Sequence, residues 1–134
     1  MSKSATAFIR ACSSGDATMV AQLLREGVAA DTRDKYKLTG LIWAGRKGHV
    51  EVAKILLLNG SDIEGIDVRG RTSLFHAVTY KRYDFVEYLV SQGGNVNPVD
   101  KHGWTPLDIA TSNHNVKMAR LLEGLGGRRV ATKA

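Results

Sequence analysis

Cysteine, proline and long apolar runs are scarce in this 134-residue sequence. The single cysteine, Cys12, cannot form an internal disulfide, which excludes disulfide-stapled folds and zinc ribbons and favours a reducing compartment. The most apolar stretch, Val52–Leu58, contains a lysine and is far shorter than the roughly 20 residues that a bilayer span needs. Residues 1–10 lack the apolar core of a signal peptide. We therefore expect no membrane anchor and an intracellular location, in the cytoplasm or the nucleus.

The composition is otherwise that of one small globular domain. Apolar residues make up 43% and charged residues 24%, values that exclude a wholly disordered chain, collagen and a coiled-coil rod. The length leaves no room for a catalytic domain plus a regulatory one. The 19 Lys and Arg residues against 13 Asp and Glu give a net charge of +6, whose meaning depends on where the charges lie.

Residues of one type recur every 33 positions along the chain, and such a period marks a repeat protein. The recurring residues are Asp34, Asp67 and Asp100; Thr39, Thr72 and Thr105; Leu41, Leu74 and Leu107; Ala44, Ala77 and Ala110; Leu56, Leu89 and Leu122; and Gly27, Gly60, Gly93 and Gly126. Four units, at about 1–33, 34–66, 67–99 and 100–127, account for a single domain over residues 1–127. Residues 128–134 are expected to form a basic, flexible tail.

Each unit is predicted to form two short helices and a turn. In the second unit, Val52, Ala53, Leu56 and Leu57 lie at helical spacing and define one buried stripe. A threonine before each first helix suits an N-cap, and Asn59-Gly60 and Gln92-Gly93 suit helix ends, because glycine adopts the left-handed conformation without strain.

Two segments carry the turn motif Asp-x-x-Gly-x-Thr followed by the first helix. These segments, residues 67–77 (DVRGRTSLFHA) and 100–110 (DKHGWTPLDIA), resemble the ankyrin-repeat motif, and residues 48–63 resemble its second half. The resemblance implies an all-α solenoid of four helix-loop-helix units with hairpin turns between them. It also implies a protein-binding scaffold without chemistry of its own, and it leaves the partner open. Because the family includes effectors of intracellular bacteria, the resemblance also leaves the cytosol of a host cell as an alternative location.

The two end units look like caps, since terminal repeats need polar outer faces. The first unit lacks the Asp-x-x-Gly-x-Thr turn, and the last carries Lys117, Arg120 and Glu123 on its second helix. We expect a monomer, because both ends look capped and because a surface that carries seven Lys and Arg residues and no acid would repel a second copy of itself. An array cut from a longer protein remains an alternative.

Three residues stand where other units have a turn glycine. Lys37 replaces a glycine of the hairpin turn, and Lys81 and His114 replace a glycine at the end of the first helix. We expect these three residues to be held in the strained left-handed region.

No residue pattern indicates catalysis or metal binding. His49, His76, His102 and His114 fall in different columns of the repeat, and no His-x-x-x-His or Cys-x-x-Cys spacing occurs. Cys12 shares its column with small residues and is predicted to be a buried packing thiol. The glycines form no phosphate-binding loop, so we expect no enzyme, no cofactor and no metal. Trp43 and His76 are predicted to be partly buried at the joins between units.

The family that this chain resembles binds partners on a concave side made of hairpin tips and the ends of the first helices. Carried over by column, this surface, which we call the hairpin face, contains Arg33, Lys35, Tyr36, Leu38, Arg46, Lys47, Arg69, Arg71, Tyr80, Lys101, His102, Trp104 and Asn113. It holds seven Lys and Arg residues and no acid, which leaves 12 basic and 13 acidic residues elsewhere. The excess positive charge therefore lies on one surface.

The hairpin face predicts a protein partner with an acidic surface or peptide, because arginines beside aromatic residues are common binding hot spots. Nucleic acid is the alternative, since the same arginines with Tyr80 and Trp104 could contact phosphates and stack on bases. A third possibility is a structural spacer in a larger complex.

Overall fold

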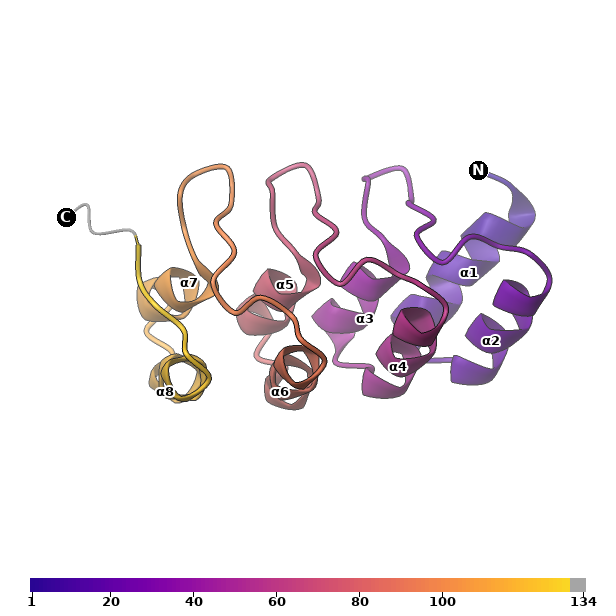
Figure 1. The fold of residues 1–134 in the computed structure, drawn as a ribbon. Helices are drawn as coiled ribbons and strands as arrows, with labels where there is room; N and C mark the ends of the chain where they lie inside the picture. The colour runs from indigo at the N-terminus through magenta and orange to yellow at the C-terminus, as the bar shows by residue number, and fades with distance from the viewer. Residues whose placement is uncertain (131–134) are drawn as a thin grey trace.

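The computed structural model describes residues 1–130, and this part of the chain contains eight helices and no extended strand. The helices are α1 (Lys3–Ser14), α2 (Ala17–Arg25), α3 (Gly40–Lys47), α4 (Val50–Leu58), α5 (Ser73–Thr79), α6 (Tyr83–Ser91), α7 (Pro106–Ser112) and α8 (Val116–Gly124). They form four pairs that stand side by side in chain order, with α1 and α8 at opposite ends (Figure 1). The loops before α3, α5 and α7 project from one side of the array (Figure 1). The structure is the predicted all-α solenoid.

Two layers of helices share one continuous core. In the first layer α1 packs on α3, α3 on α5 and α5 on α7, and in the second layer α2 packs on α4 and α4 on α6. The buried cluster runs without a break from Phe8 in α1 to Leu122 in α8. Val52, Phe85 and Met118 occupy one column of the repeat and are fully buried. Each helix pair therefore covers apolar area that its neighbour would otherwise expose.

Small residues let the first layer pack closely. A Cβ atom at Gly45 would lie 2.9 Å from the Ser73 carbonyl oxygen, so a larger residue would push α5 away from α3. Cys12 is fully buried, as predicted, and burial raises the pKa of its thiol to about 12. The thiol therefore stays protonated and unreactive, which fits a packing role.

Threonines occupy the N-caps of α3, α5 and α7, as predicted, but they do not act alike. The Thr39 hydroxyl accepts a hydrogen bond from the Ile42 amide, and Thr105 forms a capping box with Asp108. Thr72 occupies the cap position of α5 without a hydrogen bond from its side chain. The helix α1 begins earlier than its counterparts and is capped by Ser2.

The three residues that replace turn glycines all have positive φ, as predicted. The φ angles are 67° for Lys37, 63° for Lys81 and 55° for His114. The corresponding glycines, such as Gly48 with a φ of 82°, adopt the same region without a Cβ penalty.

Part of the expected flexible tail is hydrogen-bonded to the start of α7 and to the segment between α6 and α7. The Arg128 amide donates to Asn97 Oδ1 at 2.7 Å, and the Thr105 hydroxyl donates to the Arg128 carbonyl oxygen at 2.7 Å. The Val130 amide donates to Asp108 Oδ2 at 3.1 Å. Residues 128–130 thus cover the N-terminal end of α7, and residues 131–134 of that prediction lie outside the described residues.

None of the helices within residues 1–130 has both the length and the apolar character needed to cross a membrane.

Replacing Lys81 by glycine should stabilise the protein. Lys81→Gly removes the Cβ that makes a positive φ costly, so we expect the free energy of unfolding to rise by about 1 kcal/mol. Lys81→Ala also removes the side chain but keeps the Cβ, and it should bring no such rise. Thermal unfolding followed by circular dichroism compares both with the wild type, and a lower melting temperature for Lys81→Gly would contradict the backbone-strain explanation.

Candidate protein-binding site

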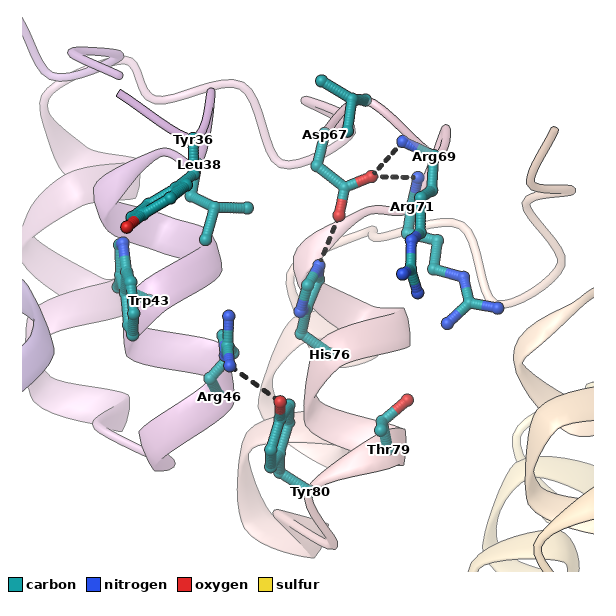
Figure 2. A pocket seen from close by; sticks show the side chains of 11 residues that line it. Tyr36, Leu38, Trp43, Arg46, Asp67, Arg69, Arg71, His76, Thr79 and Tyr80 are labelled. Carbon is teal, nitrogen blue, oxygen red and sulfur yellow. Dashed lines mark hydrogen bonds and ion pairs between the residues drawn. The ribbon is translucent and has the colours of Figure 1, made fainter. Parts of the chain in front are cut away.

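A hollow of about 540 Å³ lies between the second and third helix pairs (Figure 2). We call it the inter-repeat pocket. Its walls come from the loops before α3 and α5 and from the two helices themselves. The lining residues are Tyr36, Leu38, Trp43, Arg46, Asp67, Val68, Arg69, Arg71, His76, Thr79 and Tyr80. The pocket thus combines aromatic and aliphatic side chains with three arginines and a single carboxylate.

An aspartate fixes the shape of each projecting loop. In the loop before α5, Asp67 Oδ1 accepts hydrogen bonds from the backbone amides of Arg69 at 2.8 Å and Arg71 at 3.1 Å (Figure 2). Asp34 and Asp100 accept the equivalent pairs of amides in the other two loops. Because each carboxylate satisfies two backbone donors, the loops present their side chains from a fixed backbone.

The second oxygen of each aspartate binds a side chain. Asp34 Oδ2 accepts from the Trp43 indole nitrogen at 2.7 Å, and Asp67 Oδ2 accepts from His76 Nε2 at 2.7 Å. The tryptophan and the histidine occupy the same column, nine residues after their aspartate. This column has Ile109 in the fourth unit, and there Asp100 Oδ2 accepts from Arg71 Nε of the preceding unit at 3.0 Å. Both aspartate oxygens are therefore engaged in all three loops.

Burial and hydrogen bonds together set the protonation state of His76 and Asp67 in the pocket. Burial lowers the pKa of His76 and outweighs the opposite effect of Asp67, and the nearby Arg46 and Arg71 lower it further. Burial opposes ionisation of Asp67, but hydrogen bonds from Arg71, His76 and Arg69 together lower the pKa of this carboxyl. At neutral pH a neutral imidazole therefore donates from Nε2 to an ionised carboxylate.

Arg46 lies between two aromatic rings at the base of the pocket (Figure 2). Its guanidinium carbon is 4.7 Å from the centre of the Trp43 ring system and 4.8 Å from the centre of the Tyr80 ring. One guanidinium nitrogen, Nη2, donates to the Tyr80 hydroxyl at 2.7 Å. The backbone carbonyl of Arg46 accepts from Arg82 Nε at 2.9 Å. Both ends of this residue are thus held in place.

A family model described as "Ankyrin repeats (3 copies)" matches residues 2–67 and 57–128. The chain belongs to the ankyrin-repeat family. Similar proteins include the potassium channel AKT1 of Arabidopsis thaliana, 36% identical over 65% of this chain and 10% of the channel. Ankyrin repeat domain-containing protein 13B of Mus musculus is 34% identical, over 66% of this chain and 14% of that protein. The RelA-associated inhibitor of Mus musculus is 32% identical, over 69% of this chain and 11% of the inhibitor. The chain matches between 10% and 14% of the length of these relatives.

The inter-repeat pocket of this ankyrin array collects six residues of the hairpin face. These are Tyr36, Leu38, Arg46, Arg69, Arg71 and Tyr80. A second hollow, of about 720 Å³ between the first and second helix pairs, collects Lys35 and Lys47 and shares Tyr36. The remaining hairpin-face residues line neither hollow: Arg33, Lys101, His102, Trp104 and Asn113.

Some residues of the hairpin face are buried or already engaged by other groups of the protein. Leu38 is 8% exposed, because its loop folds it against the first layer of helices. Arg71 forms an ion pair with the buried carboxylate of Asp100 and joins two neighbouring loops. Arg33 is also partly engaged, since its Nη1 donates to the carbonyl oxygens of Lys37 at 2.6 Å and Ile66 at 2.8 Å.

Five lining residues are not among those assigned to the hairpin face: Trp43, Asp67, Val68, His76 and Thr79. Trp43 and His76 are partly buried between units, as predicted, and they also form a wall of the pocket. Asp67 is buried at its edge. For Trp43, His76 and Asp67 the sequence does hold a signal. The aspartate recurs every 33 residues, and Trp43 and His76 each lie nine residues after the aspartate of their own unit.

No group of three or more His, Cys, Asp or Glu side chains within residues 1–130 is arranged to hold a metal ion.

The His76–Asp67 pair should make stability depend on pH. Because the pKa of His76 is lower in the folded chain, the unfolded state binds its proton first, and the free energy of unfolding should fall as pH drops below about 6.5. The slope can reach about 1.4 kcal/mol per pH unit. His76→Gln keeps a donor for Asp67 but does not titrate, so urea unfolding between pH 7 and 5 should show a flatter dependence. Equal slopes for the two proteins would contradict a lowered pKa at His76.

Proposed function

We propose that this chain is a non-enzymatic scaffold that binds an acidic protein or peptide segment through the hairpin face. Ankyrin repeats generally mediate protein–protein interaction, and the family is typically a non-enzymatic scaffold, so membership implies a protein partner. The positive charge of the hairpin face favours a partner with an acidic surface.

Unpaired positive charge is the observation that carries the proposal. Of the seven Lys and Arg residues of the hairpin face, only Arg71 pairs with a carboxylate in the part of the chain that the structure describes. The six others are Arg33, Lys35, Arg46, Lys47, Arg69 and Lys101. Counting Asp34, Asp67 and Asp100 as negative leaves 7 − 3, a net charge of +4. Such a surface attracts acidic partners and accelerates their association.

Apolar side chains beside the cations of the hairpin face favour a protein over a nucleic acid as the binding partner. Tyr36 and Tyr80 are exposed, and so are Val68 and Val99 on neighbouring loops. Aromatic and aliphatic groups next to arginine supply the buried area that protein interfaces use. The side chains of Val68 and Val99 cannot form hydrogen bonds or ion pairs with the phosphate backbone of a nucleic acid.

Nucleic acid stays the competing interpretation, because cations beside exposed tyrosines also suit a single strand. Binding of a nucleic acid and binding of a protein segment should differ in their response to salt. Binding to a polyanion should weaken steeply, with the logarithm of the affinity falling linearly with the logarithm of the salt concentration, whereas a protein segment should lose only part of its affinity.

Peptides selected on the wild-type protein should be acidic and should bind the hairpin face. A random twelve-residue library displayed on phage, selected at physiological salt, should become enriched in Asp and Glu. The variant Arg69→Glu/Lys101→Glu turns two attractions into repulsions, so synthetic copies of the selected peptides should bind it about tenfold more weakly or worse. Fluorescence anisotropy of labelled peptides measures the affinities.

A control pair reverses the same number of charges elsewhere. Arg25→Glu/Arg120→Glu changes exposed residues of α2 and α8, outside the hairpin face, and should leave the affinity within about threefold of the wild type. Equal losses in both double variants, or a selected pool no more acidic than the starting library, would contradict the proposal. Tighter binding of mixed-sequence single-stranded RNA than of any peptide would favour the nucleic-acid interpretation.

A further inference from the structure

The strongest local feature of the hairpin face is the arginine at the base of the inter-repeat pocket. The guanidinium of Arg46 lies between the rings of Trp43 and Tyr80, and its Nη2 donates to the Tyr80 hydroxyl. Arg82 Nε holds the Arg46 backbone carbonyl from the next unit. The side chain has therefore already lost much of the conformational freedom that an arginine loses on binding.

This arginine has no acidic partner among the described residues. The one carboxylate in the pocket, Asp67, already accepts from two backbone amides and from His76. Apart from the bond to Tyr80, the guanidinium hydrogens of Arg46 make no hydrogen bond within residues 1–130. A partly buried guanidinium, held by two rings and lacking an anion, is suited to receive one.

The upper wall of the pocket supplies a second kind of contact. Val68 and Tyr36 are exposed, and both line the pocket together with the buried Leu38. Arg69, exposed and unpaired, stands at the rim. An anion on Arg46 would thus have apolar surface next to it and a further positive charge at the entrance.

We propose that the inter-repeat pocket anchors the partner by binding one Asp or Glu carboxylate of an extended segment on Arg46, with an apolar side chain of the same segment packed against Val68 and Tyr36. This inference rests on the proposed function and narrows it. The planar guanidinium matches the two oxygens of a carboxylate, and its fixed position makes the contact a hot spot within a wider electrostatic surface.

A double-mutant cycle tests the contact with a peptide from the phage selection. Replacing each Asp or Glu of the peptide in turn by Asn or Gln should identify one carboxylate whose loss weakens binding to the wild type by about tenfold. Against the Arg46→Gln protein the same replacement should cost less than about twofold, because the partner of that carboxylate is gone. The other acidic positions should lose affinity equally in both proteins.

Lys81→Gln is the matched control. Lys81 follows Tyr80 directly, is exposed and lies outside the pocket and the hairpin face, so the loss of its charge should change affinity by less than about twofold. Should Arg46→Gln lower the melting temperature, Arg46→Lys replaces it in the cycle. That variant keeps the charge but loses the planar fork, and it should remove most of the coupling.

The possible failures are distinguishable. If Arg69→Glu/Lys101→Glu abolishes binding while no peptide carboxylate couples to Arg46, the partner binds the hairpin face but Arg46 does not bind a carboxylate. If the selected pool is not acidic, the proposed function fails and the anchor with it. A phosphoserine placed at the coupled position that binds at least tenfold more tightly than the carboxylate would overturn the choice of a carboxylate.

Discussion

No helix pair of this chain can cover its own apolar stripe, and every other feature depends on the neighbouring pair that covers it. The fully buried Val52, Phe85 and Met118 belong to three different units but to one continuous core. Stability in such an array comes from the contacts between neighbouring units together with the units themselves. The same stacking places the loop of one unit beside the loop of the next, and this juxtaposition creates the pocket.

Polar contacts between units reinforce the stacking and also shape the hairpin face. Arg71 bridges to Asp100 of the next loop, and Arg82 reaches back to the carbonyl of Arg46. Each of these arginines removes a backbone or carboxylate group from solvent while fixing a neighbouring loop or helix end. Among the seven cations of the hairpin face, Arg71 is thus paired with a carboxylate of the next unit, whereas the six others have no acidic partner within residues 1–130.

Much of the fold was predictable because the 33-residue period places equivalent residues in equivalent environments. The burial of Cys12, the helix ends at Gly60 and Gly93, and the positive φ of Lys81 all follow from comparing columns of the sequence. The Thr72 cap was predicted as well, but its hydroxyl makes no hydrogen bond, since local geometry at a cap is not fixed by residue type alone.

The pairing of individual charges on the hairpin face was not predictable from the columns. Arg71 shares its column with Leu38 and Trp104, so nothing in the period indicates that it would bind Asp100 of the next unit. The position of Arg46 between Trp43 and Tyr80 depends on side-chain rotamers from two units, 34 residues apart for the hydrogen-bonded pair. Such contacts arise where repeats differ, and partner selectivity is expected at those same positions.

An NMR titration of the isotope-labelled protein with an acidic peptide selected on it tests most directly whether the partner binds in the inter-repeat pocket. Binding in the inter-repeat pocket should shift the Trp43 indole signal together with the backbone amides of residues 36–38 and 67–71. Amides on the exposed sides of α4 and α6 should stay unchanged. Shifts confined to the second layer of helices, with the two loops unaffected, would show that the peptide binds elsewhere.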